Sequence, residues 1–155
     1  MTTIALVDDE NSIRTSVSLA LESEGFKVDV FQNGIEALEA LESKTYDLGL
    51  FDIKMPKMDG NELLAKVRSS KKDDLKEMPI IFLTSKDQEQ DEIIGLRMGA
   101  ADYITKPFSQ KLLSERIRTV LRVYQNRKTP TNLDNTDLKN LKKGNLELDD
   151  LKQLC

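Results

Sequence analysis

The stretch DLGLF at residues 47–51 is an apolar run, and Asp52 follows it directly. Apolar runs of this length are typical of central strands in parallel sheets, which are covered on both faces. Four further stretches have strand character: residues 3–7, 26–31, 79–83 and 102–104. We therefore predict five strands, with residues 47–51 near the centre of the sheet.

Amphipathic stretches alternate with these strands. We expect helices over residues 11–24, 35–41, 61–69, 87–98 and 109–124. Asn11 and Ser109 are expected to cap the first and last helices, and Gly25 to follow the first helix in the left-handed conformation. Strands that alternate with helices predict an α/β fold with a parallel sheet covered on both faces.

The composition narrows the possible functions. The chain has 155 residues, a net charge of −4, no histidine and one cysteine, Cys155. Without histidine, catalytic triads, zinc–histidine sites and a phosphohistidine donor are excluded. The acidic balance argues against a chain that binds nucleic-acid phosphates through its own surface. We expect a cytoplasmic protein, because the start MTTIALVDDE is unlike a signal peptide and no apolar run approaches about 20 residues.

Acidic side chains follow the first and third predicted strands. Asp8 and Asp9 come after residues 3–7, and Asp52 comes after residues 47–51. The carboxyl ends of parallel strands meet at one edge of the sheet, where such folds bind ligands. Clustered carboxylates resist joint ionisation unless a cation joins them, and Mg²⁺ prefers oxygen ligands. The sequence therefore predicts a Mg²⁺ site at this edge.

We expect Asp9 and Asp52 to bind Mg²⁺ directly, Asp8 to act partly through water, and the backbone carbonyl of Lys54 to supply another oxygen. A carboxylate beside Mg²⁺ can attack a phosphoryl group and form an aspartyl phosphate. Asp52 is predicted to be this nucleophile, because it follows the most buried strand.

Thr84 and Lys106 follow the fourth and fifth predicted strands. Lys106 would neutralise the transferred phosphoryl oxygens together with Mg²⁺, and Thr84 would hydrogen-bond one of them. Taken alone, each residue has an ordinary interpretation: an acid or a threonine after a strand often caps a helix, and a lysine is usually a surface residue. Their joint placement at four strand ends favours the phosphoryl site.

Four motifs resemble the receiver domain of bacterial two-component response regulators: VDDE at 7–10, FDIKMPKMDG at 51–60, LTS at 83–85 and GAADYITKPF at 99–108. The resemblance covers about residues 3–123. It implies a flavodoxin-like (CheY-like) fold, which is a doubly wound five-stranded parallel sheet in the order 2-1-3-4-5 with five helices.

The resemblance also implies roles for particular residues. Asp52 would be the phosphoacceptor in a Mg²⁺ pocket with Asp8 and Asp9. Thr84 and Tyr103 would be the switch residues, and the bond between Lys106 and Pro107 would be cis. We expect no enzymatic activity beyond the domain's own phosphoryl transfer and dephosphorylation.

Three stretches resemble the OmpR/PhoB class, closest to ChvI-like regulators: LTSKDQEQDE, GLRMGAADYITKPFSQ and ERIRTVLR. This resemblance implies a sensor histidine kinase as partner. It also implies a homodimer formed through the face made by the fourth predicted helix (87–98), the fifth predicted strand (102–104) and the fifth predicted helix (109–124). Asp102 and Arg116 fit that dimer face. Four positions depart from the class pattern: Glu92, Arg97, Ala101 and Leu112.

We expect residues 1–123 to form the receiver domain, and residues 124–155 to be a linker and the stub of a truncated winged-helix domain. DNA would then be bound only through that missing domain. The alternative is a natural short protein with a disordered or helical tail.

Three other functions stay open. A phosphohydrolase that forms an aspartyl phosphate usually has a second acid two residues after the nucleophile, where this chain has Lys54. A flavodoxin-like nucleotide binder needs a glycine- or hydroxyl-rich loop after the first strand, where residues 8–10 would repel phosphate. A stand-alone protein-binding receiver would share the site and differ in the tail.

Overall fold

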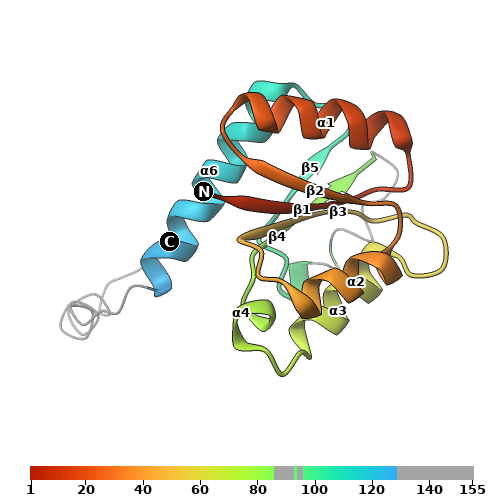
Figure 1. Cartoon of the computed structure of the whole chain (residues 1–155), viewed down its shortest axis with the longest axis vertical. Helices are drawn as coiled ribbons and strands as arrows, with labels where there is room; N and C mark the ends of the chain where they lie inside the picture. The colour runs from red at the N-terminus through yellow and green to blue at the C-terminus, as the bar shows by residue number, and fades with distance from the viewer. Residues whose placement is uncertain (86–92, 94–95, 129–155) are drawn as a thin grey trace. The chain divides into compact units, whose positions relative to one another are not determined.

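The computed structural model describes residues 1–85, 93 and 96–128. They contain a five-stranded sheet with the order β2-β1-β3-β4-β5, in which all neighbouring strands are parallel (Figure 1). The strands are β1 (Thr3–Val7), β2 (Lys27–Phe31), β3 (Leu48–Asp52), β4 (Ile80–Thr84) and β5 (Asp102–Thr105). This result confirms the predicted fold, with β3 at the centre of the sheet.

Helices cover both faces of the sheet (Figure 1). The described helices are α1 (Asn11–Ser23), α2 (Gly34–Ser43), α3 (Gly60–Arg68), α4 (Asp73–Lys76) and α6 (Gln110–Lys128). The helices α2 and α3 lie on one face, and α1 lies on the other with α6 up to Leu121. Of the helix expected over 87–98, residues 86–92 and 94–95 lie outside the described part of the chain.

Strand residues alternate between the two faces, as the period of a β-strand requires. Ala5, Val7 and Phe51 belong to the core cluster that α2 and α3 complete, whereas Ile4 and Leu6 are buried from the opposite side. Every residue of β3 and β4 is buried, which confirms the predicted central strand. Its bounds are shifted by one residue from the predicted 47–51, because Asp47 is exposed before the strand and Asp52 is its last residue. None of the described helices has the length and apolar character needed to cross a membrane.

Two details of the helices differ from the prediction. The N-cap of α1 is Glu10 rather than Asn11, and the Asn11 side chain instead accepts a hydrogen bond from Arg14. The short helix α4 was not predicted, because four residues are too few to show a helical period. The predictions for the end of α1 and the start of α6 are confirmed. Gly25 follows α1 with a left-handed φ of 96°, and the Ser109 hydroxyl caps α6 by accepting from the Leu112 N–H.

Candidate functional site

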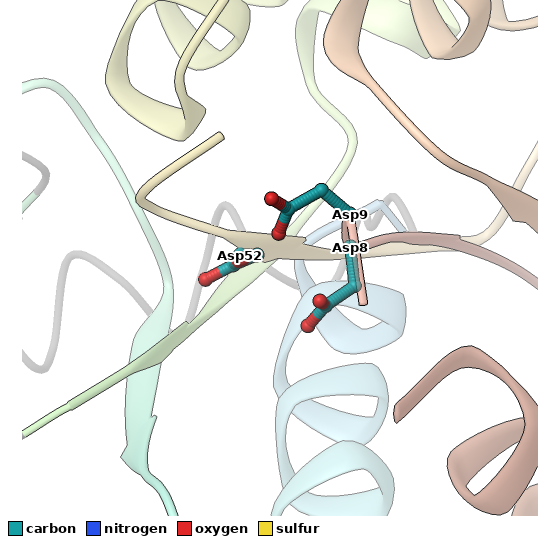
Figure 2. A group of neighbouring side chains, drawn as sticks. All are labelled: Asp8, Asp9 and Asp52. Carbon is teal, nitrogen blue, oxygen red and sulfur yellow. The ribbon is translucent and has the colours of Figure 1, made fainter. Parts of the chain in front are cut away.

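Three carboxylates meet at the carboxyl edge of the sheet (Figure 2). One carboxylate oxygen from each of Asp8, Asp9 and Asp52 lies within 4.8 Å of the other two. Asp8 and Asp9 follow β1, and Asp52 is the last residue of the neighbouring strand β3. Asp8 is fully buried, Asp52 is 5% exposed, and Asp9 is exposed. The cluster therefore opens to solvent on the side of Asp9.

Lys106 brings one positive charge to this cluster. Its Nζ lies 3.2 Å from Oδ2 of Asp8 and 3.4 Å from Oδ1 of Asp52. The lysine follows β5, and its backbone N–H donates to the carbonyl of Thr84 at 2.7 Å, which extends the pairing of β4 with β5. The peptide bond between Lys106 and Pro107 is cis, as the sequence resemblance implies. The predicted residues Asp8, Asp9, Asp52 and Lys106 thus come together.

The charges of the cluster are unbalanced. The pKa of Asp52 is raised to about 7, first by burial and then by the nearby Asp8 and Asp9 carboxylates, while Lys106 opposes the rise. Burial lowers the pKa of Lys106, but Asp52 and Asp8 outweigh this effect and leave it above its ordinary value. A divalent cation would relieve the repulsion among the carboxylates. A donor set made only of carboxylate oxygens suits Mg²⁺.

The loop after β3 holds Asp52 through its main chain. A Cβ atom at Gly60 would lie 2.5 Å from the carbonyl oxygen of Asp52, so only glycine fits there. The Gly60 N–H donates to the carbonyl of Ile53 at 2.8 Å, which closes the loop, and the φ of Lys57 is 71° within it. Lys54 is exposed in the same loop. Its carbonyl as a metal ligand stays a prediction.

The two predicted switch residues differ in exposure. Thr84, the last residue of β4, is buried, and its hydroxyl donates to the carbonyl of Ser85 at 3.2 Å. The Tyr103 side chain on β5 is 36% exposed. Their role as switch residues stays a prediction.

Asp102 and Arg116 pair with each other within the chain. The distance from Nη1 of Arg116 to Oδ2 of Asp102 is 2.9 Å, and the same nitrogen donates to the carbonyl of Tyr103 at 3.3 Å. Four apolar residues from the segments predicted to form the dimer face are exposed: Ile93, Leu96, Tyr103 and Leu112. Glu92 is outside the described residues. The dimer stays a prediction.

Two supporting residues were not singled out in the sequence. Gly60 belongs to the motif at 51–60, so the motif itself was a signal for it. Arg14, on α1, donates from Nη1 to the carbonyl of Asp8 at 2.7 Å. Nothing in the sequence indicated this contact, because it depends on the turn between β1 and α1.

A parallel sheet in this order, with an acidic cluster and a lysine at its carboxyl edge, defines a receiver-type α/β domain. The response regulator receiver domain family matches residues 4–118, and the chain belongs to this family. Receiver domains are signalling modules that act through phosphorylation.

Curated relatives and solved structures agree with this assignment. The chain is 36% identical over 151 residues to the alkaline phosphatase synthesis transcriptional regulatory protein PhoP of Bacillus subtilis, which covers 97% of the chain and 60% of the relative. It is 38% identical over 122 residues to the transcriptional regulatory protein CpxR homolog of Haemophilus influenzae, which covers 79% of the chain and 51% of the relative. The chain therefore spans about half to three fifths of the length of these relatives.

Two solved structures are similar along most of the described chain. The chemotaxis response regulator CheY4 of Vibrio cholerae has a TM-score of 0.72 and 32% identity, over 77% of the chain and 98% of that protein. A CheY-like response regulator receiver domain protein from Methanospirillum hungatei has a TM-score of 0.75 and 33% identity, over 81% of the chain and 97% of that protein.

Proposed function

We propose that Asp52 accepts a phosphoryl group from a sensor histidine kinase, at a site that holds Mg²⁺, and that this event switches the pairing of the domain with a second copy. The observation that carries the proposal is the meeting of Asp8, Asp9, Asp52 and Lys106 at one edge of the sheet. Membership of the receiver family supports the same role.

In the proposed transfer, an oxygen of Asp52 forms a bond to phosphorus while the bond from phosphorus to the imidazole nitrogen of the donor breaks. The imidazole leaves with the electron pair of that bond and takes a proton from solvent. Lys106 neutralises charge on the phosphoryl oxygens, since its ammonium already lies 3.4 Å from Asp52. Asp8, Asp9 and Asp52, with the Lys54 carbonyl, would hold Mg²⁺. When bound, Mg²⁺ supplies further positive charge at this edge.

After the transfer, the Thr84 hydroxyl would exchange its bond to the Ser85 carbonyl for one to a phosphoryl oxygen. Tyr103 would then turn inward from its exposed position. Such a change shifts the population between two packed states, and one local charge event biases it. The face that carries Asp102 and Arg116 would change its preference for pairing, which gives a homodimer.

The relatives named above are transcriptional regulatory proteins, and the chain spans about half to three fifths of their length. We therefore propose a regulator of the OmpR/PhoB class, ChvI-like in the stretches noted above, which acts in the cytoplasm. DNA would be bound through a winged-helix domain, and residues 124–155 would be the linker to that domain together with a stub of it.

The proposal predicts that Asp52→Asn cannot be phosphorylated. The full chain would be treated with a small acyl phosphate and Mg²⁺, and its intact mass measured. The wild type should gain the mass of one phosphoryl group, and D52N should gain none, because an amide is not a nucleophile toward phosphorus at neutral pH. Asp59→Asn is a matched control, since an exposed asparagine can still cap α3. A phosphorylated D52N chain would contradict the assignment.

A further inference from the structure

We propose that Arg14 is a positioning residue for the cation site: it holds the main chain between Asp8 and Asp9 so that both carboxylates face Asp52. This inference rests on the proposed Mg²⁺ site and goes beyond it, because Arg14 neither binds the ion nor touches the transferred group. The role comes from two hydrogen bonds that one guanidinium makes.

The guanidinium of Arg14 joins the start of α1 to the acidic loop. Nη1 donates to the carbonyl oxygen of Asp8 at 2.7 Å, and Nη2 donates to Oδ1 of Asn11 at 3.3 Å. The Arg14 side chain is half-buried. Because the donors of a guanidinium are fixed in one plane, two partners set the orientation of the group.

Three groups of Asp8 make hydrogen bonds that hold the loop, and the carbonyl is the group bound by Arg14. On the amino side, the Asp8 N–H donates to the carbonyl of Phe31 at 3.1 Å, which continues the pairing of β1 with β2. On the side-chain side, Oδ1 of Asp8 accepts from the Glu10 N–H at 2.9 Å. The bond from Arg14 fixes the remaining group, the carbonyl, and therefore the plane of the peptide that leads into Asp9. The direction of the exposed Asp9 side chain depends on that plane.

The positive charge of Arg14 and its hydrogen bonds should have opposite effects on the affinity for Mg²⁺. Arg14 is a cation near a cation site, so its charge alone weakens Mg²⁺ binding. Its hydrogen bonds strengthen binding, because they hold two ligands in place before the ion arrives. Replacement by lysine keeps the charge and loses the planar fork, so that only the geometric effect changes.

The test is the affinity of the full chain for Mg²⁺, measured by isothermal titration with magnesium chloride at pH 7.5. We expect Arg14→Lys to bind Mg²⁺ about tenfold more weakly than the wild type, the lower range found when groups that orient metal ligands are removed. Asn11→Ala should weaken binding in the same direction by about threefold, since it releases one side of the guanidinium. Arg118→Lys is the matched control, because that arginine pairs with Glu24 at 2.8 Å, between α6 and the end of α1.

A second readout separates positioning from general stability. With a small acyl phosphate as donor, the Mg²⁺ concentration that gives half the maximal phosphorylation rate should rise in R14K, while the rate at saturating Mg²⁺ stays within about twofold of the wild type. Thermal unfolding in EDTA reports the stability of each variant without the ion. A purely structural role would lower the unfolding temperature and leave the Mg²⁺ affinity of the folded chain unchanged.

Each result decides between the possibilities. Equal Mg²⁺ affinity in folded R14K and wild type overturns the inference and leaves the proposed function intact. Should R14K fail to fold, N11A decides: weaker binding supports the role of the guanidinium, and unchanged binding overturns it. A wild-type chain that binds no Mg²⁺ would overturn the metal site of the proposed function itself.

Discussion

Two clusters of charged side chains in this domain differ in their charge balance. At the carboxyl edge of the sheet, three carboxylates share one ammonium, Lys106. The second cluster links β2 to the segment before β3: Oδ2 of Asp29 accepts from Nζ of Lys44 at 2.8 Å and from the hydroxyl of Tyr46 at 2.6 Å. The first cluster has an excess of negative charge, whereas the second is neutral in sum.

The pKa of the central acid follows this balance. Hydrogen bonds from Lys44 and Tyr46 hold the pKa of Asp29 below its ordinary value. Burial and the neighbouring carboxylates raise the pKa of Asp52 to about 7. The balanced cluster stabilises the fold by itself, and the unbalanced one carries a cost that a ligand can relieve. Perturbed acids of the second kind are typical of functional sites.

The largest expected effect is the loss of Lys106, the cation that pairs with Asp8 and Asp52 in the unbalanced cluster. Lys106→Met should lower the rate of Asp52 phosphorylation by about 10²–10³-fold, the usual cost of losing one charge-stabilising group at a reaction centre. The rate would be measured by intact mass with an acyl phosphate at saturating Mg²⁺. Lys44→Met makes the same change in the balanced cluster and should leave the rate unchanged. Equal effects of the two substitutions would remove the distinction between the clusters.

A smaller effect is expected on the free energy of unfolding in the absence of Mg²⁺ when Asp52 is replaced. Since folding raises the pKa of Asp52, the folded chain binds more protons than the unfolded chain between about pH 4 and pH 7, and stability falls as the pH rises through this window. Asp52→Asn removes this penalty, so the variant should be roughly 2–3 kcal/mol more stable in EDTA near pH 8. The ion pair with Lys106 is already part of this shift, because Lys106 opposes the rise of the Asp52 pKa. Urea unfolding measures the difference in stability, and a less stable D52N would contradict the sign.

The balanced cluster should show the opposite pH dependence. The pKa of Asp29 is lowered on folding, so its contribution is present above the unfolded pKa and is lost as the pH falls through the folded value. Tyr46→Phe removes the hydrogen bond to Asp29 and should lower the free energy of unfolding by about 1–2 kcal/mol at pH 7. The phosphorylation rate should not change. A Y46F chain with altered phosphorylation but unchanged urea unfolding would reverse the roles of the clusters.

The two clusters were not equally predictable from the sequence. Asp8, Asp9, Asp52 and Lys106 could be placed together because each lies at the carboxyl end of a strand, and parallel topology brings these ends to one edge. The contact of Asp29 with Tyr46 has no such signal. It depends on the register that sets Asp29 opposite Ala5, and on how the segment before β3 approaches β2.

The fold itself followed from apolar runs that alternate with amphipathic stretches. The two central strands were predictable because β3 and β4 carry continuous apolar sequence. That sequence reflects their burial along the whole strand. The sequence did not indicate α4, which buries only Leu75, or the bond from Arg14 to the Asp8 carbonyl. Both depend on local turn geometry, which apolar periodicity does not encode.

The most direct test of the central claim is whether Mg²⁺ stabilises the fold through the unbalanced cluster. Urea unfolding of the full chain would be compared at pH 7.5 in EDTA and in excess Mg²⁺, for the wild type, Asp9→Asn and Lys44→Met. The account predicts a rise in the free energy of unfolding for the wild type, about 2.7 kcal/mol at one hundred times the dissociation constant. The same rise is expected in K44M, and a much smaller one in D9N. Equal stabilisation of all three chains, or none in the wild type, would contradict the account.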